Sequence, residues 1–110
     1  MNEPDKQEYE KVISSYYGDD QVSAIISLKV DTKDADKIAA QVAALENIID
    51  LFLVTGDTDI LAKARFASYG DLKNFVLNEL SKIEGIKETK TLMIVTAFKE
   101  NGNLITASGE

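Results

Sequence analysis

Hydrophobic and polar residues alternate along residues 21–31, the first clear element of the chain. The apolar positions on one side of this segment are Val22, Ala24, Ile26, Leu28 and Val30. Because successive side chains of a β-strand point to opposite faces, this period of two predicts a strand with one buried face.

Helical spacing replaces the alternation in residues 33–45, where apolar side chains recur every three or four positions. Asp34 and Asp36 lie in the predicted first turn, where the helix dipole favours acids. A second helix is predicted over residues 69–83, with Ser68 as its N-cap and Gly85 just after its C-terminus. The same spacing predicts a short amphipathic helix over residues 5–17.

Three further strands are predicted, over residues 47–54, 60–67 and 90–98. The resulting order, strand–helix–strand followed by strand–helix–strand, is typical of a ferredoxin-like βαββαβ sandwich, an α+β fold. Right-handed crossovers then place both helices on one face of a four-stranded antiparallel sheet.

The other face of this sheet is predicted to be apolar as well. The second strand places Ile48 and Phe52 on one side and Ile49, Leu51 and Leu53 on the other. In the fourth strand, the two sides are Leu92 and Ile94 against Met93 and Val95. A large exposed apolar face usually marks an interface, so we expect a second copy of the chain to pack there, sheet to sheet.

The chain is predicted to be a single domain with short extensions, as its length of 110 residues suggests. Residues 1–20 are assigned to the N-terminal helix and a linker, and residues 21–98 to the domain. Residues 99–110 form a hairpin and tail, because Asn101-Gly102 is a strong signal for a type I′ turn.

Composition excludes several functions. The chain has no cysteine and no histidine, so it lacks thiolate ligands, a cysteine nucleophile and the commonest general base. Its net charge of −7, with scattered basic residues, disfavours direct nucleic-acid binding. The N-terminus does not resemble a signal peptide, and no apolar run reaches the roughly 20 residues that span a bilayer. A cytoplasmic protein without membrane contact is expected.

A polar loop, Thr55-Gly56-Asp57-Thr58-Asp59, joins the second and third strands. A plain hairpin needs one residue that tolerates positive φ, which Gly56 or Asp57 can supply. The two acids and two threonines go beyond this need. The loop is therefore either a well-solvated turn or part of a binding site.

Several segments together resemble one known family. They are Val54 to Asp59, Leu72 to Leu80, Ile83-Glu84-Gly85-Ile86 and Glu88-Thr89-Lys90-Thr91. In order and spacing, they resemble the regulatory, amino-acid-binding half (the RAM domain) of the Lrp/AsnC transcription regulators, over roughly residues 21–98.

The resemblance implies dimers formed through the sheets, rings of dimers that are commonly octamers, and small amino acids bound between dimers near the hairpin. Family members normally also carry an N-terminal helix-turn-helix domain, whereas only some twenty residues precede the first strand here. The chain thus resembles a stand-alone regulatory domain that does not bind an operator itself.

The resemblance also implies the ligand-binding residues. Gly56, Asp57, Thr58 and Asp59 would form the loop side of the site, and Thr89 and Thr91 would line it from a strand of a neighbouring subunit. An amino acid needs acceptors for its ammonium and donors for its carboxylate, which these groups supply. The alternatives are ordinary turn chemistry for the two acids and β propensity for Thr89 and Thr91. No metal or cofactor is predicted, since no loop has the EF-hand spacing.

The predicted function is that of an amino-acid sensor without enzymatic activity, acting on transcription through a DNA-binding Lrp/AsnC relative. A structural adaptor that assembles with such a relative without binding a ligand is the alternative. A small enzyme is less favoured. Its candidate residues, Asp50, Asp57, Arg65 and Tyr69, form no recognisable nucleophile–base pair.

Overall fold

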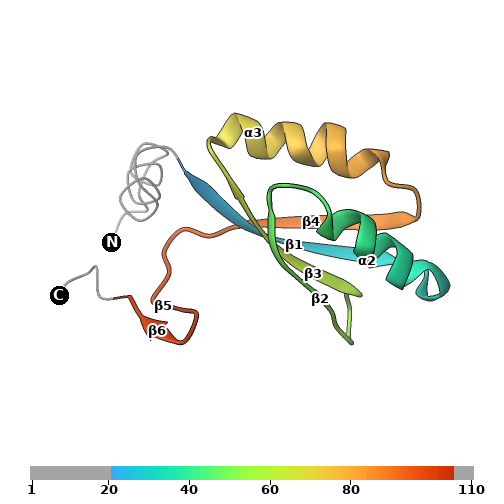
Figure 1. Ribbon diagram of the computed structural model, residues 1–110, viewed down its shortest axis with the longest axis horizontal. Helices are drawn as coiled ribbons and strands as arrows, with labels where there is room; N and C mark the ends of the chain where they lie inside the picture. Colours follow the sequence, from blue (N-terminus) through green and yellow to red (C-terminus); the bar gives the residue numbers. More distant parts are fainter. Residues whose placement is uncertain (1–20, 106–110) are drawn as a thin grey trace, which may run out of the picture.

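The computed structural model describes residues 21–105, so the predicted helix at residues 5–17 lies outside the described residues. A four-stranded sheet has the order β2-β3-β1-β4, and every neighbouring pair is antiparallel. Both helical segments cover the same face of the sheet (Figure 1). The ferredoxin-like α+β prediction is confirmed.

The central strand β1 (Val22–Val30) pairs with β3 (Ile60–Phe66) on one side and with β4 (Ile86–Met93) on the other. Its alternate residues from Val22 to Val30 are all buried, as the sequence pattern predicts. They form the core together with β3 and the helices. The side chains of the remaining positions, such as Ser27 and Lys29, point to the opposite side, here called the second face.

The first helical segment consists of a 3₁₀ turn, η1 (Thr32–Asp34), and helix α2 (Ala35–Ala43). The second runs without a break through α3 (Tyr69–Asn74), a π-helical turn η2 (Phe75–Glu79) and a 3₁₀ turn η3 (Leu80–Lys82). It begins as predicted, because the Ser68 hydroxyl accepts a hydrogen bond of 3.1 Å from the Asp71 N–H.

The fourth strand begins at Ile86, four residues earlier than predicted, and ends at Met93, so the predicted range 90–98 was wrong. The helical segment ends at Lys82, Gly85 has a positive φ of 99° in the turn that follows, and the next residue, Ile86, already pairs with Val30. The apolar run after Lys90 gave the stronger sequence signal, yet the chain leaves the sheet after Met93. Beyond that point the Ile94 N–H still donates to the Ser23 carbonyl at 2.9 Å.

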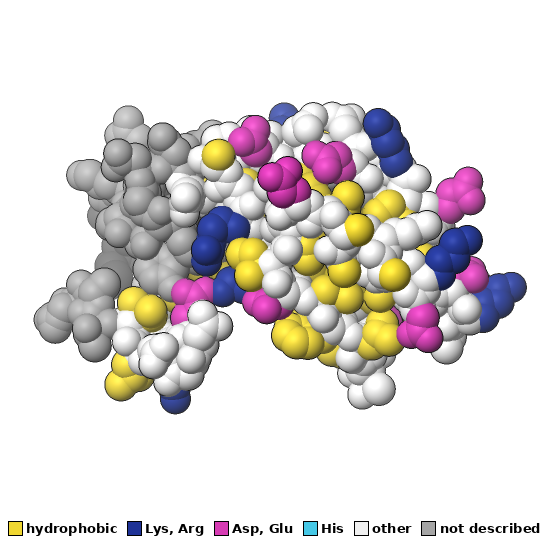
Figure 2. All heavy atoms as spheres, viewed as in Figure 1, with side chains coloured by type: hydrophobic (Ala, Val, Ile, Leu, Met, Phe, Trp, Pro, Cys, Tyr) yellow, Lys and Arg dark blue, Asp and Glu magenta, His cyan; other side chains and the backbone are white. Residues whose placement is uncertain are grey.

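Strand β2 (Ile48–Leu53) contains a bulge that changes which residues share a face. Ile48 is opposite Ala64 and Leu51 is opposite Ala62, so both face the core. Phe52 is opposite Leu61 and lies on the second face. The prediction that Ile48 and Phe52 share a face was wrong, because a bulge shifts the alternation by one residue. Hydrophobic side chains reach the surface along the β2 edge of the molecule (Figures 1 and 2).

A small C-terminal hairpin of β5 (Lys99–Glu100) and β6 (Asn103–Leu104) follows. Asn101 and Gly102 have φ of 53° and 79°, which confirms the predicted hairpin turn. The Glu100 carboxylate pairs with Lys63 and lies 4.0 Å from the Arg65 guanidinium. These ion pairs attach the hairpin to the second face, and Figure 2 shows acidic and basic side chains at this junction.

Candidate functional site

The loop between β2 and β3 is held in place by backbone hydrogen bonds. The Val54 N–H donates to the Asp59 carbonyl at 2.9 Å, which closes the loop. The Asp59 N–H donates to the Leu28 carbonyl at 3.0 Å, which attaches the loop to β1. Gly56 supplies the required positive φ, 130°, and a Cβ there would meet nothing within 4 Å.

Two side chains of the loop are also bonded to β1. The Thr58 hydroxyl donates to the Leu28 carbonyl at 2.9 Å and accepts from the Ser27 hydroxyl at 2.6 Å. The Asp59 carboxylate accepts from the Val30 N–H at 2.9 Å. Thr58 and Asp59 therefore have a structural function whether or not a ligand binds.

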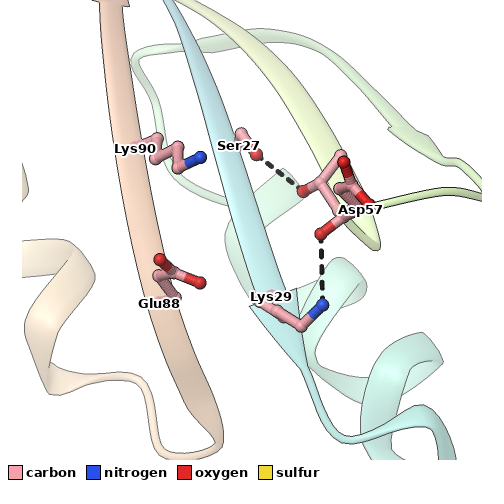
Figure 3. Close-up of a pocket in the computed structure, with 6 residues that line it drawn as sticks. Ser27, Lys29, Asp57, Glu88 and Lys90 are labelled. Carbon is pink, nitrogen blue, oxygen red and sulfur yellow. Dashed lines mark hydrogen bonds between the residues drawn. The ribbon is translucent and has the colours of Figure 1, made fainter.

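A pocket of 160 Å³ lies beside this loop on the second face of the sheet (Figure 3). Two cross-strand pairs form its floor, because Ser27 of β1 is opposite Lys90 of β4 and Lys29 is opposite Glu88. The loop between β2 and β3 forms a wall beside this floor. The pocket is lined by Ser27, Lys29, Asp57, Thr58, Glu88 and Lys90.

Charged groups of both signs face this pocket. The Lys29 ammonium donates to the Asp57 carbonyl at 3.2 Å. Among residues 21–105, neither Glu88 nor Lys90 has a hydrogen bond or an ion pair through its side chain. The pocket thus presents an acid and a base that do not pair with each other.

The predicted ligand-binding residues fall into separate groups. Asp57 and Thr58 line the pocket, whereas Gly56 and Asp59 belong to the same loop without lining it. Thr89 and Thr91 are opposite Leu28 and Ile26, two core residues, and so point to the helix-covered face. One chain alone does not bring these threonines to the loop pocket. Their predicted part in a site still requires a neighbouring subunit.

Sequence comparison identifies the family of this fold and loop. The family model of the Lrp/AsnC ligand binding domain matches residues 23–104. The chain belongs to the Lrp/AsnC family. This confirms the resemblance seen in the sequence.

Curated relatives of this Lrp/AsnC domain are HTH-type transcriptional regulators. One from Pyrococcus furiosus is 30% identical over 96 residues, which cover 87% of this chain and 64% of the relative. YugG of Bacillus subtilis is 29% identical over 112 residues, covering 91% of this chain and 68% of YugG. The chain thus spans about two thirds of the length of these relatives.

Solved structures share the fold of this Lrp/AsnC domain. AsnC of E. coli has a TM-score of 0.69 at 20% identity, covering 92% of this chain and 62% of AsnC. A Neisseria meningitidis transcriptional regulator in complex with L-Met has a TM-score of 0.68 at 21% identity, covering 98% of this chain and 66% of that chain. The structure FFRP-DM1 has a TM-score of 0.64 at 20% identity, covering 66% of this chain and 97% of that chain.

Sequence reasoning missed four pocket residues of this Lrp/AsnC domain: Ser27, Lys29, Glu88 and Lys90. The available signal was the alternation of side chains along a strand, since Glu88 and Lys90 flank Thr89 and so point to the face opposite Thr89 and Thr91. Only the register of β4 against β1 reveals which set faces the loop.

The structure also places the residues that the sequence offered for an enzyme. Of the four residues weighed for an enzyme, only Asp57 lines the pocket. Within the described part of the chain, no cluster of three acidic, histidine or cysteine residues is arranged to hold a metal ion. No helix among residues 21–105 is long and apolar enough to cross a membrane.

Proposed function

We propose that this Lrp/AsnC domain binds a free amino acid in the loop pocket and acts as a sensor in transcription regulation. The observation that carries this proposal is the unpaired Glu88 and Lys90, two residues apart on one side of β4. At about 3.3 Å per residue, their backbones are roughly 7 Å apart. A zwitterion between them would find an anion for its ammonium and a cation for its carboxylate.

The remaining pocket groups suit the same ligand. Lys29 uses one N–H for the Asp57 carbonyl, and an ammonium has three donors, so it retains others for a carboxylate. The solved complex of the Neisseria meningitidis regulator holds L-Met, which is a ligand of this class. This supports an amino acid rather than an inorganic ion.

The pocket is small for a complete site. Its volume of 160 Å³ is below the roughly 300–1,000 Å³ of typical small-molecule sites. Phe52 and Leu92 are more than half exposed on the same face, although both are large and apolar. We propose that a second copy packs on this face and completes the pocket.

A larger ring of dimers would allow Thr89 and Thr91 to line a ligand site, as the sequence predicts. They lie on the other face of the sheet, so they would reach the loop of a neighbouring dimer rather than that of their own chain. The octamer implied by the family resemblance is one such assembly.

Regulation would follow from linkage between ligand binding and assembly. A ligand that prefers the assembled form stabilises it by its differential affinity, and so changes the surfaces available to partners. A DNA-binding Lrp/AsnC relative in the cytoplasm is the proposed partner.

The test is a thermal-shift screen of the twenty L-amino acids, paired with light scattering to determine the size of the assembly. One or a few amino acids should raise the melting temperature of the wild-type chain in a dose-dependent way. No shift with any of the twenty would reject the proposal. Copurification of a DNA-binding relative in that case would favour the adaptor instead.

Point variants locate the site. Lys90→Ala should weaken binding by about 1.5–3 kcal/mol, the usual contribution of a charged hydrogen bond, and Glu88→Gln should also weaken it. Lys73→Ala is the matched control, because Lys73 is exposed on α3 and belongs to the helix side. Equal affinity for Lys90→Ala and Lys73→Ala would place the ligand elsewhere.

A further inference from the structure

We propose that Ser27 makes the loop pocket select the ammonium group, so that it binds amino acids and rejects the corresponding 2-oxo acids. This inference rests on the proposed function, because it assigns the orientation of the same ligand. It concerns a specificity-determining residue that acts through the direction of one hydrogen bond.

The direction of the bond between Ser27 and Thr58 follows from the partners of Thr58. Its hydroxyl has a single proton, and the contacts with carbonyl oxygens are 2.9 Å to Leu28 and 3.4 Å to Ile60. A carbonyl oxygen cannot donate, so the Thr58 proton is committed to a carbonyl. The 2.6 Å contact between the two hydroxyl oxygens then requires the proton of Ser27.

Ser27 therefore faces the pocket as an acceptor only. Its proton is used toward Thr58, and its lone pairs remain available on a side chain that lines the pocket. An oxygen in this state binds an N–H donor and repels the oxygen of a carbonyl group. In Figure 3, Ser27 lies on β1 between the loop and Lys90 of β4.

The four side chains of the pocket floor form a square, in which diagonally opposite residues have the same hydrogen-bonding character. Ser27 is opposite Lys90, and Lys29 is opposite Glu88. The two acceptors, Ser27 and Glu88, form one diagonal, and the two ammonium groups form the other. An α-amino acid matches this pattern, with its ammonium between the acceptors and its carboxylate between the lysines.

A 2-oxo acid has the same carboxylate but a carbonyl oxygen in place of the ammonium. It would leave Ser27 and Glu88 without a donor and bring an oxygen against both. Sites that hydrogen-bond a ligand N–H reject analogues lacking it, because their own polar groups stay unpaired. We expect a preference of roughly 10- to 100-fold for the amino acid, the range given by a charged hydrogen bond.

Isothermal titration of matched pairs tests this inference: L-alanine with pyruvate, L-glutamate with 2-oxoglutarate, and L-methionine with 4-methylthio-2-oxobutanoate. The wild-type chain should prefer the amino acid in each pair for which it binds either member. Ser27→Ala should lose most of this preference by binding the amino acid more weakly, with little change for the oxo acid.

Two further variants distinguish selection from a general structural effect. Thr58→Val keeps Ser27 but frees its proton, so the preference should fall there too, even if Ser27→Ala does not fold. Ser81→Ala is the matched control, since the Ser81 hydroxyl donates to the Leu77 carbonyl on the exposed side of the helical segment. It should keep the wild-type preference.

The outcomes separate this inference from the proposed function. If no amino acid binds, the proposed function fails and the inference fails with it. If amino acids bind but the wild-type chain does not discriminate against oxo acids, only the inference is overturned. An unchanged preference in a folded Ser27→Ala variant would overturn it as well. If Ser27→Ala does not fold, an unchanged preference in Thr58→Val would overturn it.

Discussion

Ser27 of β1 and Thr58 of the β2–β3 loop share a hydrogen bond of 2.6 Å, although 31 positions separate them in the chain. Thr58 also donates to the Leu28 carbonyl, so one hydroxyl connects the loop to both the side chain and the backbone of β1. The loop is therefore fixed beside the pocket by the fold itself. A ligand would meet a preformed wall, which lowers the entropy lost on binding.

Removing the Thr58 hydroxyl should destabilise the chain. Thr58→Val keeps the shape of the side chain but leaves the part-buried Ser27 hydroxyl without its acceptor. We expect a loss of about 1–3 kcal/mol in the free energy of unfolding, measured by urea denaturation. Thr58→Ser retains the hydroxyl and should lose less. Equal stability of the valine variant and the wild type would show that these bonds contribute nothing.

Asp59 should contribute to stability through its bond to the Val30 N–H. In Asp59→Ala this part-buried donor loses a charged acceptor, which should cost about 1.5–3 kcal/mol in urea denaturation. Asp59→Asn keeps a carbonyl oxygen and should cost less. Asp57→Ala is the control, because within the described residues no hydrogen bond to the Asp57 carboxylate is present.

The same Asp59 variants distinguish the contribution of this residue to stability from its predicted contact with the ligand. If Asp59 also holds the ammonium, Asp59→Ala should weaken ligand binding under conditions where the variant is fully folded. An unchanged dissociation constant would remove Asp59 from the site and leave its effect on stability alone.

Gly85 and Ile38 should be energetically coupled. A Cβ on Gly85 would lie 2.7 Å from the Ile38 Cδ1, and its φ of 99° is strained for any other residue. Gly85→Ala should therefore cost about 1–3 kcal/mol in stability. Ile38→Val removes the clashing methyl group, at its own cost of about 0.5–1.5 kcal/mol.

A double-mutant cycle measures this coupling. In the Ile38→Val background, Gly85→Ala should lower the free energy of unfolding only through backbone strain, because the clash is gone. The loss of stability in the double variant should therefore be at least about 0.5 kcal/mol smaller than the sum of the losses in the two single variants. Strict additivity would mean that the clash is relieved by movement of the helical segment.

The sequence predicts elements best where burial produces a clear period. The alternation in β1 and the helical spacing around Ile38 are direct consequences of one buried side, so these elements are as predicted. Strand β4 lies at the sheet edge, and its first half has polar side chains on both faces. No alternation of apolar and polar residues marks the start of this strand. The prediction therefore followed the apolar residues after Lys90 and placed the strand too late.

The site was predictable only on its loop side. Asp57 and Thr58 stand out because a bare turn needs neither. The other pocket residues depend on two facts that require pairing of distant segments: the register of Ser27 against Lys90, and the side of the sheet on which the loop lies. A shift by one residue would exchange Lys90 for Thr89 or Thr91, the residues that family resemblance selected.

The proposed second copy should depend on Leu92. This side chain is 62% exposed on the second face, opposite the half-buried Ile25. In a sheet-to-sheet dimer it would be desolvated, so Leu92→Asp would bury an unpaired charge and oppose association. Sedimentation velocity should show a dimer or larger species for the wild type and a monomer for Leu92→Asp at the same concentration.

Leu77 provides the matched control for this prediction. It is 59% exposed, nearly as much as Leu92, but lies on the helical segment rather than on the second face. Leu77→Asp should leave the assembly intact, and both variants should remain folded by circular dichroism because neither side chain is part of the core. If both substitutions disrupt the assembly equally, the interface is not confined to the sheet. If the wild type is itself monomeric, the second copy cannot complete the pocket, and a ligand would have to bind to the open half-site of a single chain.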